Sequence, residues 1–336
     1  MTKASDRCRL GRSKVQVSRL GFGTTALGNL MRVTPAEEAA AAVDAAWGAG
    51  LRYFDTAPQY GQGLAEERLG AALAGRTRSD WVLSTKVGKL LRPTPDGRAP
   101  SGLFVGAGAH EIEFDYSYDG TMRSLESSLR RLGVDRVDIA LVHDVNRRYH
   151  GDNVYQRLSE AKAGAVKALS KLRSEGVIGA FGPAFNDVDI LMTFVREADV
   201  DCLMLPRGYS LLNQQAAAEL LPECLRRTVS VLIASPFESG ILATGSVPGA
   251  TYLYAPADEE VHARVRRLEA VCRDYDTPLA AAALQFPARH PAIASVVVGM
   301  RSAAEVAANI ASIGRPIPSE FWGALEREQL IAPLNI

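Results

Sequence analysis

The chain of 336 residues lacks the features that mark several classes of protein. No apolar run reaches the length of about 18 residues that a membrane-spanning helix needs. Lysine and arginine together number 38, as do aspartate and glutamate, so no excess of positive charge is available to attract nucleic acid or acidic membranes. We therefore expect neither a nucleic-acid nor a membrane partner, and no pattern indicates an oligomeric state.

Cysteines and histidines are few and scattered. The four cysteines form no CxxC pair, so we expect buried thiols in a reducing compartment and no disulfide framework. The five histidines form neither an HxH nor an HExxH pattern, so no metal site is expected. The N-terminal segment is polar and charged and lacks the apolar centre of a secretory signal. Together these observations indicate a cytoplasmic protein.

Short apolar, β-branched runs recur eight times, and segments with helical spacing fill the intervals between them. The expected strands are 20–24, 53–57, 81–87, 139–144, 179–183, 202–206, 231–237 and 295–299. The expected helices are 36–50, 122–133, 163–176, 187–198, 215–227, 261–275 and 303–313. Thr34 is expected to cap the first helix, with Pro35 as its first residue and Glu37 completing a capping box.

Eight alternations of strand and helix predict an α/β fold, the (β/α)8 TIM barrel, as a single domain over residues 1–336. A doubly wound open sheet is the alternative. The residues around Gly11 are expected to form an N-terminal β-hairpin that closes the bottom of the barrel. Three connections, 88–118, 144–160 and 243–258, are too long for simple turns and all follow strands. We expect them at the C-terminal mouth as a pocket wall or lid, with disordered insertions as the alternative.

Four side chains that could carry chemistry lie at or just after consecutive strand ends. Asp55, Lys86 and His143 follow the second, third and fourth strands, and Tyr60 comes five residues after Asp55. Each alone could be an ordinary turn, loop or core residue. Together they could transfer a proton, because a nearby ammonium lowers the pKa of a phenol. At about 4 Å and an effective dielectric of about 20, a lysine ammonium lowers that pKa by at most about three units. We therefore expect Lys86, oriented by Asp55, to make Tyr60 acidic, and His143 to bind the substrate oxygen.

Several segments resemble the aldo-keto reductase superfamily from end to end. They are GFGTTALG, YFDTAPQYG, LSTKVG, SLRRLGVDRVDIALVHD and VVGMRSAAEVAANI. The resemblance implies a (β/α)8 barrel with a nicotinamide cofactor across its C-terminal face, and a catalytic tetrad of Asp55, Tyr60, Lys86 and His143. DYSYDGTMRSLESSLRRLG, HDVN, RGYSLLNQ and SPFESGILATG are similar to the branch of aldose and pyridoxal dehydrogenases.

The same resemblance implies the cofactor-binding residues. Gly23 and Thr24 correspond to a turn that contacts the nicotinamide ribose, and Asn186 stands near the place of a nicotinamide anchor, where many relatives carry Ser-Asn instead of Ala184-Phe185-Asn186. Positions near the pyrophosphate correspond to Ser235, Phe237, Ser239, Gly240 and Leu242. Positions toward the adenosine half correspond to Gly299, Arg301, Ser302, Glu305 and Asn309. A plain capping box explains Ser302 and Glu305 equally well.

The expected cofactor is NAD, with NADP as the alternative. The carboxylate of Glu305 would repel the 2′-phosphate of NADP and could accept from a ribose hydroxyl, whereas Arg301 argues for NADP.

The resemblance implies oxidation of a sugar hemiacetal at C1 to its lactone, as in aldose 1-dehydrogenases of the L-fucose, L-galactose or D-threo-aldose type. The alternatives are a pyridoxal 4-dehydrogenase that gives 4-pyridoxolactone, and a general aldehyde or ketone reductase. A different class, a Schiff-base aldolase using Lys86, stays open, as does a regulatory subunit that senses cofactor. A small-molecule sugar or pyridoxal is therefore the expected substrate.

Overall fold

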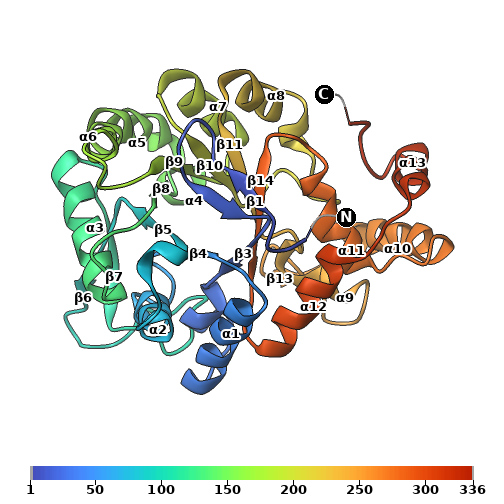
Figure 1. Cartoon of the computed structure of the whole chain (residues 1–336), viewed down its shortest axis with the longest axis horizontal. Helices are drawn as coiled ribbons and strands as arrows, with labels where there is room; N and C mark the ends of the chain where they lie inside the picture. The colour runs from blue at the N-terminus through green and yellow to red at the C-terminus, as the bar shows by residue number, and fades with distance from the viewer. Residues whose placement is uncertain (1–2, 335–336) are drawn as a thin grey trace.

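Eight parallel strands close into a barrel in the computed structural model, which describes residues 3–334 (Figure 1). The barrel strands are β3 (Leu20–Gly23), β4 (Tyr53–Asp55), β5 (Val82–Val87), β8 (Ile139–His143), β9 (Ala180–Ala184), β10 (Cys202–Leu205), β11 (Ser230–Ala234) and β14 (Ile293–Gly299). Neighbours follow chain order around the ring, and β14 pairs with β3 to close it. The expected strands and the (β/α)8 fold are confirmed.

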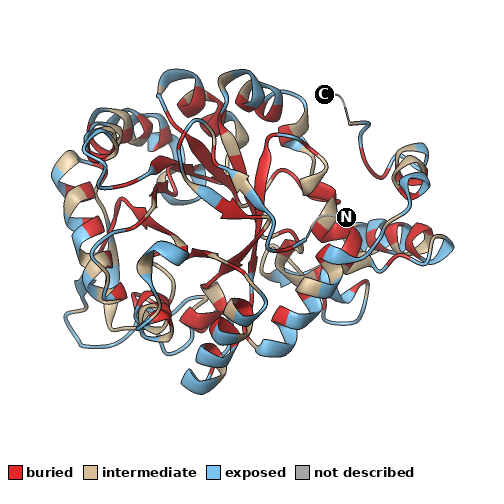
Figure 2. Cartoon of the chain, viewed as in Figure 1, coloured by how far each residue is buried: buried red, intermediate tan, exposed pale blue. Residues whose placement is uncertain are grey.

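Helices surround the barrel and turn their exposed faces outward (Figures 1 and 2). They are α1 (Ala36–Gly48), α2 (Leu64–Leu73), α3 (Tyr118–Leu132), α4 (Arg147–His150), α5 (Val154–Ala161), α6 (Lys167–Ser174), α7 (Val188–Glu197), α8 (Leu220–Arg227), α9 (Ile241–Thr244), α10 (Glu259–Asp274), α11 (Leu279–Ala288), α12 (Ala303–Gly314) and α13 (Ser319–Arg327). None of the helices between residues 3 and 334 combines the length and the hydropathy that a bilayer crossing requires.

Three helices of nine or more residues were not expected from the sequence. In α2 and α11 the apolar residues are not confined to one face: α11, for example, reads LAAAALQFPA, which is almost uniformly apolar. The third is α13, close to the C-terminus. The 144–160 connection is also more helical than expected, because it contains α4 and most of α5. Helix α5 then continues into α6 through a π-helical turn at Lys162–Val166.

The expected cap of the first helix is wrong. Helix α1 begins at Ala36 and no side chain caps it. The hydroxyl of Thr34 instead donates to the carbonyl of Ala26 at 2.8 Å and accepts from the guanidinium of Arg301. Thr34 therefore ties the β3–α1 connection to the loop after β14, a contact between residues 267 positions apart.

The N-terminal hairpin closes one end of the barrel, as expected. Strands β1 (Arg7–Arg9) and β2 (Gln16–Ser18) pair antiparallel and cross the centre of the ring in Figure 1. Leu10 and Val17 are fully buried in the cluster that fills the barrel interior. Gly11 has φ +53, and a Cβ there would lie 2.1 Å from the carbonyl oxygen of Asp201, just before β10. The hairpin thus seals the N-terminal ends of the strands and leaves the C-terminal ends open.

Three smaller antiparallel features complete the fold. The 88–118 connection contains the hairpin of β6 (Lys89–Pro93) and β7 (His110–Phe114). The 243–258 connection contains the short pair β12 (Thr251–Tyr252) and β13 (Ala255–Pro256). Phe104 pairs with Leu30 in a single antiparallel bridge. The long connections are therefore ordered parts of the mouth.

Candidate functional site

A pocket with about 1110 Å³ of atom-free space, part of it open to solvent, lies at the C-terminal ends of the barrel strands. Each of the three long connections contributes an aromatic residue to it: Phe104, Tyr149 and Tyr254. The expectation that these connections form the pocket wall is confirmed.

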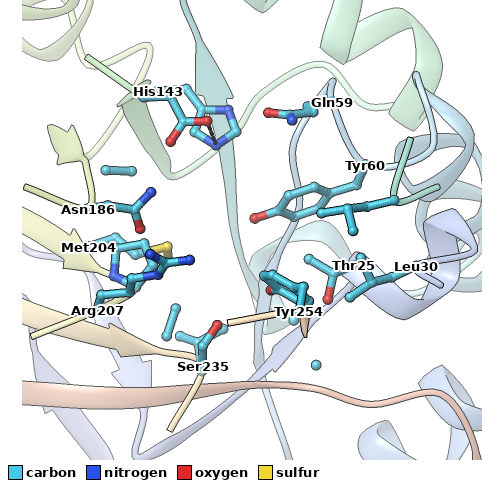
Figure 3. Close-up of a pocket in the computed structure, with 18 of the residues that line it drawn as sticks. Thr25, Leu30, Gln59, Tyr60, His143, Asn186, Met204, Arg207, Ser235 and Tyr254 are labelled. Carbon is cyan, nitrogen blue, oxygen red and sulfur yellow. Dashed lines mark ion pairs between the residues drawn. The ribbon is translucent and has the colours of Figure 1, made fainter. Parts of the chain in front are cut away.

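The four residues expected to carry chemistry all line this pocket. Asp55 is the last residue of β4, Lys86 lies near the end of β5, and His143 is the last residue of β8. Because the strands are parallel and adjacent, their ends meet at one edge of the barrel. The rings of Tyr60 and His143 stand edge to face, with centroids 6.3 Å apart (Figure 3).

Lys86 and Asp55 form a buried ion pair. The ammonium of Lys86 donates to the two carboxylate oxygens of Asp55 at 3.0 and 2.8 Å and to the carbonyl of Thr56 at 3.0 Å. The side chains are only 2% and 4% exposed. The hydroxyl of Ser84 donates to Asp55 at 2.6 Å. Since all three ammonium hydrogens have an acceptor, Lys86 is held in one orientation.

Two glycines allow the turn that carries Tyr60 to pack closely at the open end of the barrel. A Cβ at Gly61, which has φ +65, would lie 2.6 Å from the carbonyl oxygen of Gly28, and a Cβ at Gly28 would lie 2.6 Å from the carbonyl carbon of Tyr60. The turn that carries Tyr60 therefore packs directly on the backbone after β3. This places the Tyr60 ring with its centroid 4.9 Å from the ammonium of Lys86.

The expectation that Lys86 makes Tyr60 acidic stays a prediction, and the surroundings of the phenol act against it. Burial raises the pKa of the Tyr60 phenol well above its ordinary value, and the carboxylates of Asp55 and Asp144 raise it further. Tyr60 is therefore protonated at neutral pH.

His143 is a neutral imidazole. Burial lowers its pKa well below the ordinary value, and the charges of Lys89 and Lys86 act in the same direction. Its Nε2 lies 3.5 Å from an oxygen of Asp144. Its Nδ1 is buried and finds no hydrogen-bond partner within residues 3–334. A neutral imidazole in this setting has one N–H to donate to a substrate oxygen.

Five of the expected cofactor residues line the same pocket: Gly23, Asn186, Ser235, Ser239 and Gly299. Figure 3 shows Asn186 and Arg207 extending into the pocket from one side, across from Tyr60. A Cβ at Gly299 would lie 2.8 Å from the hydroxyl oxygen of Thr25, so a glycine there keeps this part of the cleft open. Small residues, an amide and hydroxyls around a cleft of this size fit a nicotinamide and its ribose.

Three side chains expected near the nicotinamide ribose and the pyrophosphate lie outside this pocket. Thr24 is fully buried, and its neighbour Thr25 lines the pocket instead (Figure 3). Leu242 is fully buried in the hydrophobic core, and Phe237 packs against that core. Gly240 also stays outside the pocket lining, whereas Glu238 and Ser239 of the same turn belong to it. The side chains of Thr24 and Leu242 therefore cannot contact a ligand.

Arg301 differs most from its expected role. Its guanidinium donates to the carbonyl oxygens of Leu30 at 2.7 Å and Arg32 at 3.1 Å, and to the hydroxyl of Thr34. The residue is only 9% exposed. Its hydrogen bonds hold the β3–α1 connection, so it is not available to bind a phosphate.

The start of α12 is a capped helix terminus. The hydroxyl of Ser302 accepts from the backbone N–H of Glu305 at 3.2 Å, and the carboxylate of Glu305 accepts from the N–H of Arg301 at 2.8 Å. This confirms the plainer explanation of both residues as helix initiators. Glu305 is exposed, and Asn309, one helical turn on, is buried. The contacts of Ser302, Glu305 and Asn309 with adenosine stay predictions.

Sequence reasoning missed several residues of the pocket. Gln59, Asp144 and Arg207 line it, and a second buried lysine, Lys89, stands behind it. Each is close in sequence to a residue or segment that was singled out: Asp144 follows His143, and Lys89 comes three residues after Lys86. Proximity to a strand end was the available signal. Residues 3–334 contain no group of three or more His, Cys, Asp or Glu side chains placed to hold a metal ion.

Known proteins resemble this chain over almost its whole length. The model of the aldo/keto reductase family matches residues 19–328. A pyridoxal 4-dehydrogenase from Microbacterium luteolum is 40% identical, with 98% of this chain and 99% of the relative covered. A D-threo-aldose 1-dehydrogenase from a Pseudomonas species is 41% identical, with 94% and 95% covered.

Among solved structures, the holo form of an aldo-keto reductase from Bacillus halodurans superposes with a TM-score of 0.73 at 27% identity, covering 97% of this chain and 95% of that one. The fold and these relatives define a (β/α)8-barrel oxidoreductase that works with a nicotinamide cofactor. The chain belongs to the aldo/keto reductase family.

Proposed function

We propose that the protein is an NAD-dependent dehydrogenase that oxidises the cyclic hemiacetal of an aldose at C1 to the lactone. The observation that carries the proposal is the convergence of Tyr60 and His143 above the buried Lys86–Asp55 pair in one pocket. The similarity to a D-threo-aldose 1-dehydrogenase supports the choice of substrate.

The reaction removes a hydride from C1 and a proton from its hydroxyl group. The bound oxidised nicotinamide supplies the hydride acceptor and a positive charge. Tyr60 takes the hydroxyl proton as its own phenolic proton moves on to solvent, and His143 donates an N–H to the same oxygen, where charge develops. In the reverse direction the protonated phenol of Tyr60 is the group that donates a proton to the carbonyl oxygen. Lys86 and Asp55 position the phenol.

Two contacts support NAD over NADP. The guanidinium of Arg301 is committed to backbone oxygens and to Thr34, so it offers no partner to a 2′-phosphate. The exposed carboxylate of Glu305 lies at the start of α12, where the family resemblance places the adenosine. A negative charge there favours a ribose hydroxyl over a phosphate group.

Pyridoxal is the second candidate substrate, and the pyridoxal 4-dehydrogenase at 40% identity favours it. The Schiff-base alternative has no support in the geometry, because an aldolase needs a free amine and the ammonium of Lys86 is bound to Asp55 and Thr56. The single-domain organisation and the cytoplasmic location stay predictions.

A panel of substrates tests the proposal. The purified protein is assayed for NADH and NADPH formation with L-fucose, L-galactose, D-arabinose and pyridoxal. We expect oxidation of at least one aldose, with a higher kcat/KM for NAD than for NADP. Oxidation of pyridoxal without any aldose would overturn the choice of substrate, and covalent trapping of a substrate on Lys86 by borohydride would overturn the reaction class.

A further inference from the structure

A second buried ion pair lies beside the pocket, and the proposed reaction does not use it. The ammonium of Lys89 donates to an oxygen of Asp144 and to the side-chain oxygen of Gln59. Lys89 is 1% exposed and the side chain of Asp144 is 10% exposed. The three residues come from three different strand ends, after β5, β8 and β4.

Stability alone is a poor explanation for this pair. Burial lowers the pKa of Lys89 and the charge of Asp144 restores it only in part, so the charged lysine sits in an unfavourable environment. Apolar residues of similar volume would serve the fold as well or better. The backbone of Asp144 adds a further cost, because its φ of +55° is uncommon for a residue other than glycine. Unfavourable backbone conformations of this kind are found most often at residues that bind a ligand.

The pair presents its negative member to the pocket. Asp144, Gln59 and Tyr149 belong to the pocket lining, whereas Lys89 does not. The ammonium lies behind them, 4.4 Å from the centroid of the Tyr149 ring and 5.2 Å from that of Phe114. The amide of Gln59 donates to the hydroxyl of Tyr149 at 2.9 Å. Lys89 thus holds a polar wall in place without reaching the substrate itself.

Asp144 keeps capacity to accept hydrogen bonds. One of its oxygens accepts from the amide of Asn146 at 3.0 Å, and the other accepts from Lys89. An ionised carboxylate offers about four acceptor positions, so two remain. The oxygen bound to Lys89 also lies 3.5 Å from Nε2 of His143. A substrate whose reacting oxygen binds His143 therefore brings the group on its neighbouring carbon within reach of Asp144.

We propose that Asp144, held by Lys89, determines substrate specificity by accepting a hydrogen bond from the hydroxyl group on C2 of a neutral sugar. This inference rests on the proposed function and names the part of the sugar that the pocket recognises. A sugar hydroxyl stays neutral near pH 7 and can donate to the carboxylate. In pyridoxal the carbon next to the reacting C4′ carries no hydroxyl group, and the acidic phenol lies one carbon further on, where its ionised form is repelled by the carboxylate. The wall thus selects a polyhydroxylated sugar over pyridoxal.

The test compares an aldose that the enzyme accepts with its 2-deoxy analogue. In the wild-type enzyme the 2-hydroxyl should raise kcat/KM by about 10- to 100-fold, the value of a hydrogen bond to a charged group. The double variant Lys89→Met/Asp144→Gly removes both charges together, and glycine suits the positive φ. In this double variant the ratio of kcat/KM for the aldose to kcat/KM for its 2-deoxy analogue should be close to one. The matched variant Lys89→Met/Asp144→Asn keeps an acceptor oxygen and should give an intermediate ratio.

The outcomes separate the inference from the proposed function. An enzyme that oxidises no aldose contradicts the proposed function. An enzyme that oxidises aldoses but treats the 2-deoxy analogue equally well contradicts only the inference, and this wild-type result is decisive even where a variant fails to fold. An equal loss on both substrates in the double variant also overturns it, because Asp144 would then act through His143.

Discussion

The Lys86–Asp55 pair allows a prediction whose size follows from the structure. Both partners are almost fully buried, and the ammonium provides two of the hydrogen bonds that the carboxylate receives. Lys86→Met leaves Asp55 buried with only the hydroxyl of Ser84 as a donor. Breaking a buried pair on one side costs about 3–5 kcal/mol. Against a typical total of about 5–15 kcal/mol, this loss removes a large part of the stability.

A second variant separates the pair from the lysine itself. Lys86→Met/Asp55→Asn removes both charges, and the amide keeps the shape of the carboxylate. We expect it to recover most of the loss, since no uncompensated buried charge remains. Denaturant unfolding followed by tryptophan fluorescence gives both free energies of unfolding, and the single variant Asp55→Asn completes the double-mutant cycle that gives the coupling between the two residues. Both variants should lack oxidoreductase activity, which shows that activity and stability depend on the pair separately.

The reasoning is refuted if Lys86→Met unfolds at the same denaturant concentration as the wild-type protein. It is also refuted if the double variant is as unstable as the single one. Either result would mean that the carboxylate of Asp55 is solvated or neutralised by another group.

Two further predictions concern the cofactor and the pH dependence of stability. Glu305→Arg should raise the NADP-to-NAD ratio of kcat/KM about tenfold or more by replacing a repulsive charge with an attractive one, and an unchanged ratio would place ribose recognition elsewhere. Burial lowers the pKa values of His143, His150 and His290, so each binds a proton more readily when unfolded. The free energy of unfolding should therefore fall as the pH drops from about 7.5 to 5.5, by up to about 1.4 kcal/mol per pH unit for each histidine. The variant His290→Gln should reduce this slope. A free energy of unfolding that does not change over this pH range would contradict the lowered pKa values.

Much of the barrel can be predicted from local sequence patterns. Runs such as IALVHD are buried on both faces and continuous in apolar character, so strand β8 and its neighbours could be predicted with their ends. Strand order then brings Asp55, Lys86 and His143 to one edge without further information. Helix α11 could not be found in the same way, because it is apolar on all sides and periodicity has no polar face to detect.

The errors in the site arise from contacts between distant segments. Which of Thr24 and Thr25 faces the pocket depends on how the turn after β3 packs against its neighbours. Arg301 binds a segment that lies 267 to 271 positions earlier in the chain, and nothing near it in sequence signals this. The pKa of Tyr60 depends on how far the phenol is buried and on which carboxylates lie near it, which a list of nearby residue types cannot supply.

The role of Tyr60 as the group that exchanges the substrate proton is tested most directly by Tyr60→Phe. Loss of a general acid–base group lowers kcat by about 10²- to 10⁴-fold, and the phenyl ring preserves the packing around Lys86 and His143. We predict this loss in steady-state oxidation of an aldose, with the affinity for NAD, measured by quenching of protein fluorescence, unchanged. A Tyr60→Phe enzyme that binds NAD and turns over at the wild-type rate would contradict the account.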